Sequence, residues 1–360
     1  MAAVGERALN FSSGPAMLPE VVLRRAQTAI WDLDGSGIGI LEHSHRGKEF
    51  GRVLDGAEAA VREVAGLSND HAVLFVTAGA TAHFAMVPQN FLAPGATADY
   101  CHTGIWSGKA MEEARRIGGV HVACSSEGDG FSSTPTLFDW SAAPRYVHYT
   151  SNETIYGTQW SAPPPAPAGV PLVSDASSDI FSRPWPIGQH ALVYAGAQKN
   201  LGPSGISLVI AKRSFLDTGA TALSPLAQYR TYAKDKSMHN TPNTFGVWMI
   251  GEVCRWILEQ GGLTGVGERN ARKAAKLYAA LDGSRHWRAH AKPGSRSQMN
   301  VTFRGDTTAR EEQMLAAAEA HGLLGLRGHR SVGGLRASIY NAFPEAGVDR
   351  LIALLHEHDA

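Results

Sequence analysis

The chain has 360 residues, 44% of them hydrophobic, which is enough to bury a sizeable core divided between two domains. Its 33 basic and 33 acidic residues give a formal net charge of zero, without a basic tail or a block of like charges. Nucleic acid and membrane surfaces are therefore not expected as partners. No apolar run approaches the length of a transmembrane span.

The cysteines and the N-terminal stretch favour the cytoplasm. Cys101, Cys124 and Cys254 are odd in number and lack the spacing of metal ligands, so reduced thiols and no metal site are expected. The stretch MAAVGERALNFSS contains no apolar core of signal-peptide length.

The N-terminal part predicts two amphipathic helices. Val22, Ala26 and Ile30 recur every four residues after Pro19, and Gly35 is expected to end this first helix. A glycine-rich segment leads to the second helix, which ends at Gly66. The buried face of the second helix is expected at Val53, Leu54, Ala57, Val61 and Val64.

From residue 72 onward, short apolar runs alternate with helices, one of them near 111–117. Strands are expected at 73–76, 97–101, 120–123, 145–149, 171–175, 192–194 and 206–210. This alternation predicts an α/β fold with a mainly parallel seven-stranded sheet and helices on both faces. A smaller C-terminal α/β unit follows. Its helices and strands are expected at 247–259, 266–281, 298–303, 308–320 and 335–340, with a final helix.

Lys199 lies in the stretch YAGAQKNLGPSG (194–205), in a turn between two apolar runs. Such a lysine is partly desolvated, so its pKa should fall and its amine can attack an aldehyde. A surface lysine at a turn is the more common case, but Asp175 ends another apolar run 24 residues earlier (199 − 175). Pyridoxal phosphate (PLP) uses this pair, the lysine for the Schiff base and the aspartate for the pyridinium nitrogen.

Five motifs, in the same order along the chain, resemble those of phosphoserine aminotransferases. They are FSSGPAMLP (11–19), HSHRGKEF (43–50), AGAQKNLGPSG (195–205), HNTPNTF (239–245) and GHRSVGGLRASIYNA (328–342). This family consists of class V transaminases of PLP fold type I. The resemblance implies a large PLP-binding domain at 16–260 and a small C-terminal domain at 261–360. It also implies an N-terminal arm at 1–15 that packs with the small domain.

The phosphate of the cofactor is expected at the loop after strand 73–76. Gly79, Ala80 and Thr81 offer backbone N–H groups at a helix start, and the Thr81 hydroxyl is a further donor. An isolated glycine at this place would more commonly indicate an ordinary turn between a strand and a helix. The position of this loop relative to the five family motifs favours the phosphate site. By resemblance, Gln198 also reaches the phosphate.

The resemblance assigns the remaining cofactor contacts. Trp106 is expected to stack on the pyridine ring, and Thr154 to contact the cofactor near its phenolic oxygen. Asn240 and Thr241 come from the neighbouring subunit in this family, which implies a homodimer with shared active sites.

A substrate with two anionic ends needs cations at both, and arginine forks suit carboxylate and phosphate alike. By resemblance, Arg336 takes the α-carboxylate. His45, Arg46, His329 and Arg330 resemble the distal anion pocket of the family.

The chain also departs from the family pattern. Many members carry an arginine where this chain has Thr81, which removes one cation from the distal pocket. His83 stands where glutamine is usual, and Asn243 where a second proline is.

The resemblance implies ping-pong transamination between O-phospho-L-serine and 2-oxoglutarate, giving 3-phosphohydroxypyruvate and glutamate in serine biosynthesis. In some bacteria the family also uses 4-phosphohydroxy-L-threonine in pyridoxine biosynthesis. A cysteine desulfurase-like lyase is one alternative, but it needs a nucleophilic cysteine in the C-terminal part, and none follows Cys254. An alanine–glyoxylate-type aminotransferase would not need two distal His-Arg pairs. A non-catalytic PLP-binding homologue would be expected to lack Lys199 or Asp175.

Overall fold

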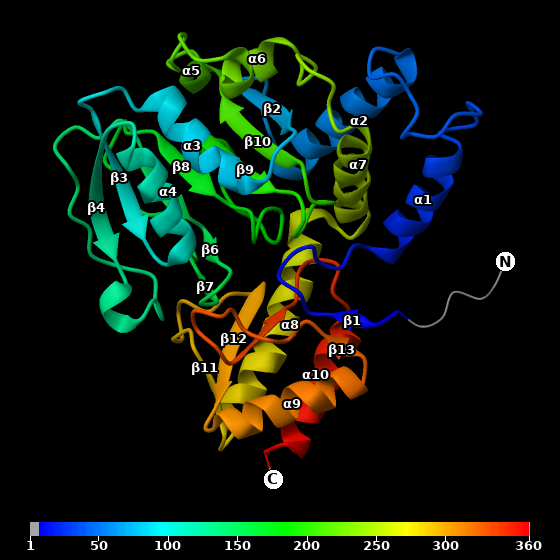
Figure 1. Cartoon of the computed structure of the whole chain (residues 1–360), viewed down its shortest axis with the longest axis vertical. Helices are drawn as coiled ribbons and strands as arrows, with labels where there is room; N and C mark the ends of the chain where they lie inside the picture. Colours follow the sequence, from blue (N-terminus) through cyan, green and yellow to red (C-terminus); the bar gives the residue numbers. More distant parts are fainter. Residues whose placement is uncertain (1–6, 360) are drawn as a thin grey trace.

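The computed structural model describes residues 7–359, so the first six residues of the predicted arm lie outside the described part. A large sheet with its helices fills the upper part of Figure 1, and a smaller three-stranded sheet with three helices fills the lower part. The predicted α/β fold is confirmed.

The large sheet has seven strands in the order β2-β10-β9-β8-β5-β3-β4. Only β10 runs opposite to the other six strands, because the turn 197–206 joins it to β9 without a crossover helix. The mainly parallel sheet is therefore confirmed. In sequence order its strands are β2 (His71–Val76), β3 (Thr97–His102), β4 (Gly119–Ser125), β5 (Val147–Thr150), β8 (Leu172–Asp175), β9 (Leu192–Gly196) and β10 (Ser207–Lys212).

Helices cover both faces of this sheet, as predicted. On β2, Val73 and Phe75 point into a core shared with one group of helices, while Leu74 and Val76 point into a second core. The first core contains α1 (Glu20–Trp31), α2 (Lys48–Ala65) and α7 (Thr244–Glu259). The second contains α3 (Ala80–Phe91), α4 (Ile105–Arg115) and α6 (Tyr229–Lys234), with the short α5 (Arg213–Leu216) beside it.

The two N-terminal helices differ in how well their patterns predicted them. The predicted buried face of α2 is confirmed in full. In α1 the repeat of four residues does not follow one buried face, because Ile30 is 43% exposed whereas Ala29 is buried. At 3.6 residues per turn, Ile30 lies roughly 80° round the helix from Val22, whereas Ala29 lies roughly 20° away. The helix also ends at Trp31, before Gly35.

The lower part is built on β11 (Trp287–Ala289), β12 (Asn300–Gly305) and β14 (Leu335–Ser338). It packs against α8 (Gly262–Gly283), α9 (Thr308–Ala320) and α10 (Glu345–Glu357). The N-terminal segment joins it, because β1 (Leu9–Asn10) pairs with β13 (Leu323–Leu324) and Phe11 lies in the same core. The domain boundary between residues 260 and 261 stays a prediction.

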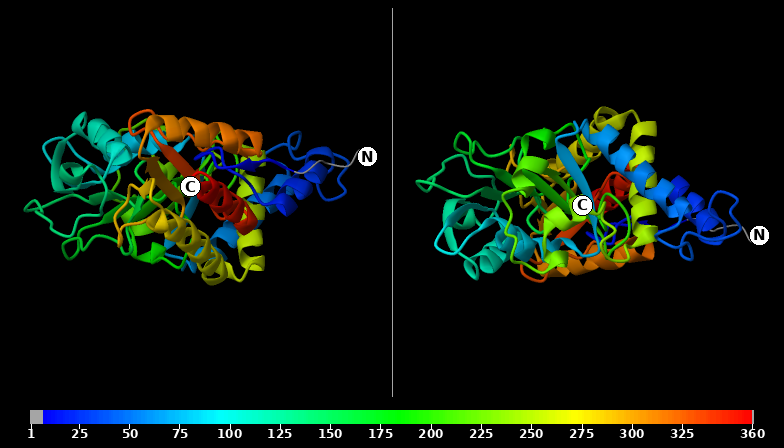
Figure 2. Two further views of the ribbon diagram at one scale, coloured as in Figure 1. Left: turned by 90° about the horizontal axis from the view of Figure 1, so that it is seen from below. Right: turned by 90° about the horizontal axis from the view of Figure 1, so that it is seen from above.

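A small hairpin of β6 (Asn152–Glu153) and β7 (Thr158–Gln159) lies between the two parts. Figure 2 shows that α1 and the segment after it project from one side of the molecule. Among residues 7–359, no helix is both long and apolar enough to cross a membrane.

Candidate active site

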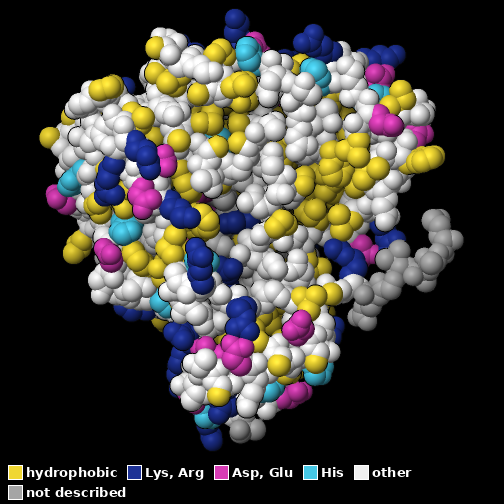
Figure 3. Space-filling model, in the orientation of Figure 1, with side chains coloured by type: hydrophobic (Ala, Val, Ile, Leu, Met, Phe, Trp, Pro, Cys, Tyr) yellow, Lys and Arg dark blue, Asp and Glu magenta, His cyan; other side chains and the backbone are white. Residues whose placement is uncertain are grey.

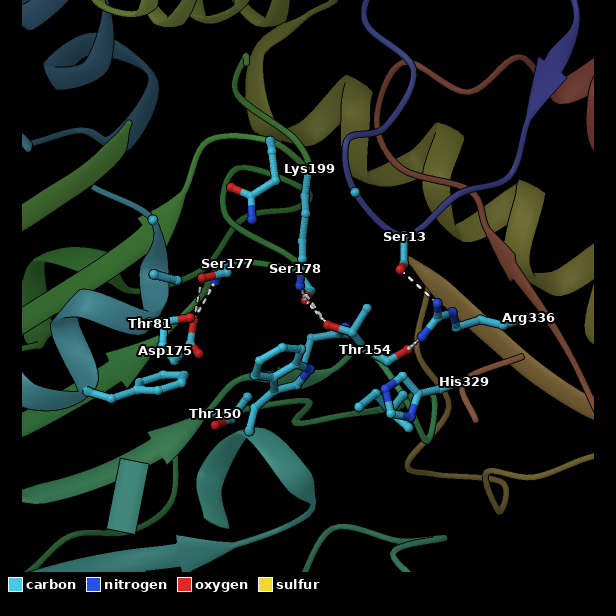
Figure 4. A pocket seen from close by; sticks show the side chains of 18 residues that line it. Ser13, Thr81, Thr150, Thr154, Asp175, Ser177, Ser178, Lys199, His329 and Arg336 are labelled. Carbon is cyan, nitrogen blue, oxygen red and sulfur yellow. Dashed lines mark hydrogen bonds between the residues drawn. The ribbon is translucent and has the colours of Figure 1, made fainter. Parts of the chain in front are cut away.

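A pocket lies at the carboxyl ends of β5, β8 and β9, bounded by the starts of α3 and α4, by the N-terminal segment and by β14 (Figure 4). This edge of a parallel sheet is where α/β proteins bind ligands. The predicted residues that line it are Gly79, Ala80, Thr81, Trp106, Thr154, Asp175, Gln198, Lys199, His329 and Arg336.

The Lys199 amine lies at the centre of the pocket and is only 9% exposed. Its Nζ donates hydrogen bonds to Thr154 Oγ1 at 2.7 Å and to Ser178 Oγ at 2.6 Å. Burial lowers the pKa of Lys199 to about 8, although the negative charges of Asp175 and Glu153 oppose this. The neutral, nucleophilic form of the amine is therefore accessible near neutral pH.

Asp175, the last residue of β8, presents one carboxylate oxygen to the pocket. Its Oδ1 accepts bonds from the Ser177 backbone N–H at 2.9 Å and from the Ser177 hydroxyl at 2.6 Å. No described residue donates to Oδ2. Burial raises the pKa of Asp175, and the Ser177 bonds and the charge of Lys199 oppose that rise. A proton-bearing ring nitrogen would supply the missing donor for Oδ2.

The start of α3 offers an anion site. Gly79 is the N-cap residue, so the N–H groups of Ala80 and Thr81 have no partner within the helix. They lie at the N-terminus of α3, which is the positive end of the helix dipole. A Cβ built at Gly79 would meet no atom within 4 Å, so the space beside this N-cap residue is open.

Four buried polar atoms of pocket residues have no hydrogen-bond partner among the described residues. They are Trp106 Nε1, Thr150 Oγ1, Gln198 Oε1 and Arg336 Nε. Buried polar groups are normally paired, so these atoms indicate a polar ligand. An amine, an open carboxylate oxygen, an anion-binding helix start and an indole together fit PLP.

Arg336, on β14, holds the side of the pocket away from Asp175. One guanidinium nitrogen donates to Ser13 Oγ at 2.7 Å, another to the Thr154 carbonyl at 3.5 Å, and Nε stays free for a ligand (Figure 4). Ser13 and Ser178 also line the pocket and were not predicted from the sequence. The glycine-containing FSSGP and the serine-rich SDASSD around them were the available signals.

Five predicted residues do not line the pocket of their own chain: His45, Arg46, Asn240, Thr241 and Arg330. Arg330 is exposed beside His329, which does line it. The other four lie in two loops that touch, because Thr244 Oγ1 donates to the Ile40 carbonyl at 3.3 Å.

Two of the departures from the family pattern have structural partners. His83 is buried and shares hydrogen bonds with the Tyr229 hydroxyl at 2.8 Å and with Ser207 Oγ at 2.6 Å. Asn243 caps α7 by accepting a bond from the Gly246 N–H at 2.8 Å.

Comparison with known proteins agrees with this geometry. Residues 8–351 match the family Aminotransferase class-V. The phosphoserine aminotransferase of Herpetosiphon aurantiacus is 49% identical over 96% of this chain and 97% of its own length. The enzyme of Nitrosomonas europaea is 46% identical over 97% and 98%.

Solved structures agree as well. Phosphoserine aminotransferase from Bacillus circulans subsp. alkalophilus superposes with a TM-score of 0.96 at 45% identity, covering 99% of each chain. The PLP-bound enzyme from Trichomonas vaginalis gives a TM-score of 0.92 at 33% identity, covering 97% of this chain and all of its own. Alanine–glyoxylate aminotransferase from Nostoc sp., at 16% identity and a TM-score of 0.77, shows a likeness of fold alone.

The chain belongs to the class V aminotransferases and is a PLP-dependent enzyme of fold type I. Within that class, the relatives reported above at 33% identity or more are phosphoserine aminotransferases.

Proposed function

We propose that this enzyme transfers the amino group of O-phospho-L-serine to 2-oxoglutarate, giving 3-phosphohydroxypyruvate and glutamate, in serine biosynthesis. The observation that carries the proposal is a single pocket holding Lys199, Asp175 and Arg336, in a chain similar to phosphoserine aminotransferases over nearly its full length. The same pocket chemistry suits 4-phosphohydroxy-L-threonine in pyridoxine biosynthesis.

Each pocket residue has a distinct task. When bound, PLP supplies an aldehyde for the link to lysine and a ring that withdraws electrons. Lys199 Nζ would hold that link and, when free, would take the proton from the substrate's Cα. Asp175 Oδ2 would accept a hydrogen bond from the protonated ring nitrogen, and the indole of Trp106 would contact the ring. The Thr154 hydroxyl accepts a hydrogen bond from the lysine amine.

The α-carboxylate and the phosphate of the substrate bind to different residues. Arg336 binds the α-carboxylate through its free Nε edge. His329 and Arg330 bind the distal phosphate. Burial and the charges of Arg336 and Arg330 lower the pKa of His329, so its imidazole is neutral at pH 7 and contributes hydrogen bonds, while Arg330 contributes charge.

A comparison of amino donors tests the substrate. We expect kcat/KM for phosphoserine to exceed the values for alanine and cysteine by at least about 100-fold, because only phosphoserine fills the distal anion pocket. Pyruvate or sulfide production would report the two alternative activities. Equal use of alanine and phosphoserine would refute the proposed substrate. The lyase alternative is not favoured, because Cys254 is buried in α7 and burial raises its pKa to about 12.

Arg330→Ala in the same assay should lower kcat/KM for phosphoserine by about 10- to 100-fold, the usual cost of losing a charged hydrogen bond. Arg327→Ala is the matched control. Arg327 lies in the same loop, but its guanidinium is paired on the surface with Glu312 at 2.6 Å, and its removal should leave the rate unchanged.

We further propose a homodimer with shared sites, in which Asn240, Thr241, His45 and Arg46 reach the partner's pocket. Figure 3 shows hydrophobic side chains gathered over α1 and α7. Trp31, the last residue of α1, is 85% exposed, and Leu41, in the loop that carries His45 and Arg46, is 59% exposed. An apolar surface of this kind supports burial against a second copy.

Mixing two inactive variants tests the shared site. Lys199→Ala damages the site of its own subunit, and Thr241→Arg blocks the site of the partner. Hybrid dimers then contain one site with neither change, so mixing should restore up to about a quarter of wild-type activity if subunits exchange at random. Each variant mixed with itself is the control. If exchange is verified and no activity returns, the sites are not shared.

We also propose a cytoplasmic location and the three-part organisation 1–15, 16–260 and 261–360. The three cysteines are free and buried, which supports a reducing compartment. The N-terminal strand lies in the same core as the C-terminal sheet, which supports an arm that packs with the small domain.

A further inference from the structure

Glu153, the last residue of β6, is a buried acid that the mechanism above does not use. Its side chain is 1% exposed. Two backbone N–H groups converge on its carboxyl group: Trp106 donates to Oε2 at 3.3 Å and Ile155 donates to Oε1 at 3.4 Å. The first of these bonds reaches the opening turn of α4, which carries the indole that lines the pocket.

The start of α4 is shaped around this carboxyl group. The N-cap residue, Gly104, has no side chain, and a Cβ built there would lie 2.6 Å from Glu153 Cδ. Ser107 Oγ accepts the N–H groups of Thr103 and Gly104, and Glu153 accepts that of Trp106. A residue from a distant hairpin therefore occupies the space of the missing cap side chain and takes over part of its role.

The next residue in the chain, Thr154, makes the connection to the lysine, since its hydroxyl accepts a hydrogen bond from Lys199 Nζ. The charged and titratable groups that act on Glu153 or feel its charge are Lys199, Asp175, Arg336 and Tyr156. Burial raises the pKa of Glu153 to about 8, against the bonds from Ile155 and Trp106 and the charge of Lys199. Glu153 and Lys199 therefore change charge in the same pH range.

We propose that Glu153 is a positioning residue for transamination: its buried carboxyl group fixes the helix start that carries Trp106, and its negative charge, beside that of Asp175, favours the protonated form of Lys199. This inference depends on the binding of PLP, which class V aminotransferases share, and not on phosphoserine as the substrate. The test therefore measures PLP binding without any amino donor.

Glu153→Gln is the informative change, because glutamine has nearly the same shape. Both oxygens of the Glu153 carboxyl group can accept a converging N–H, in the ionised form and in the protonated form, whereas a glutamine side chain has one acceptor oxygen and turns an NH₂ group toward the other donor. One buried N–H is then unsatisfied, and the start of α4 shifts from its place.

The first measurement is the dissociation constant of PLP, obtained by absorbance titration of the full-length protein after removal of its cofactor. Glu153→Gln should weaken PLP binding by about 5- to 100-fold. Glu311→Gln is the matched control. Glu311 is also a buried acid that accepts a backbone N–H, from Gly305 at 3.1 Å, but it lies on α9 away from the pocket. It should lower the melting temperature and leave PLP binding unchanged.

The second measurement is the pH dependence of the rate at which Lys199 captures PLP. The neutral amine reacts, so the rate rises with pH as Lys199 loses its proton. In the wild type, ionised Glu153 favours the ammonium and delays that loss. Removing the Glu153 charge should move the midpoint of the rate–pH curve to lower pH. The curve should also become narrower, because only Lys199 then titrates.

A Glu153→Gln protein that melts lower, yet binds PLP normally with an unshifted midpoint, would overturn the proposal and leave Glu153 a purely structural acid. If Glu153→Gln does not fold, Glu153→Asp carries the same test. Aspartate keeps the charge but is one methylene too short to reach Trp106. It should weaken PLP binding without moving the midpoint to lower pH, and unchanged binding would again overturn the proposal.

Discussion

Replacing Lys199 by alanine should lower transamination by at least about 10⁴-fold while PLP still binds noncovalently. The Lys199 amine both links to the cofactor and moves the Cα proton. The variant therefore loses both functions at once. Borohydride treatment followed by peptide mass analysis should find the cofactor attached to Lys199 in the wild type and to no residue in the variant.

Lys212→Ala is the control for this experiment. Lys212 ends β10 at the end of the sheet opposite the pocket, where within residues 7–359 its Nζ bonds only to the Gln189 carbonyl at 3.4 Å. Activity and labelling should therefore be unchanged. Substantial activity in the Lys199→Ala protein would show that another group is the catalytic amine.

The largest effect on stability is expected from Lys273→Met. Lys273 lies on α8 with no exposed surface, and its ammonium donates to the carbonyls of Ile339, Tyr340 and Phe343 at 2.9, 2.7 and 3.1 Å. Methionine fills the space and relieves the cost of burying a charge, but it removes the donor that the Ile339 and Phe343 carbonyls use and leaves the Tyr340 carbonyl with only the Phe343 N–H at 2.9 Å. We expect a loss of about 3–5 kcal/mol in the free energy of unfolding.

Chemical denaturation followed by circular dichroism measures this loss. Lys276→Met, one turn further along the same helix, is the matched control, because Lys276 is 43% exposed and pairs with Glu345 and Asp349 on the surface. It should leave the free energy of unfolding nearly unchanged, because surface ion pairs contribute little to stability. Equal losses in the two variants would show that the three carbonyls do not depend on Lys273.

The sequence predicted the strands of the large sheet better than the helix starts. Strands such as β2 and β9 are uninterrupted apolar runs bounded by polar residues, and burial on both faces requires that pattern. Helix α4 was expected near 111–117 but begins at Ile105. Its start could not be located because Gly104 has no capping side chain, and the acceptor comes from Glu153, far away in the sequence.

Some residues of the candidate site could be predicted from the sequence, and others could not. Lys199 and Asp175 could be singled out because each follows a buried strand and the pair has a known chemical use. Ser178 and Glu153 could not, since their partners lie 21 and 47 residues away and no local pattern marks a buried polar contact. The lowered pKa expected for Lys199 is confirmed, because desolvation follows from the two strands around it.

The hydrogen bond between Ser13 and Arg336 joins residues 323 positions apart. The pocket can therefore be complete only after nearly the whole chain has been synthesised. The ribosome releases the N-terminal segment first, and β13 and β14 among the last elements. A nascent chain can collapse its large sheet around Lys199 well before that point, since those contacts lie within one domain-sized stretch. The carboxylate-binding side of the pocket forms only when the last hundred residues arrive and the waiting N-terminal segment pairs with them. A chain that stalls in between carries the reactive amine without the arginine that would orient a substrate.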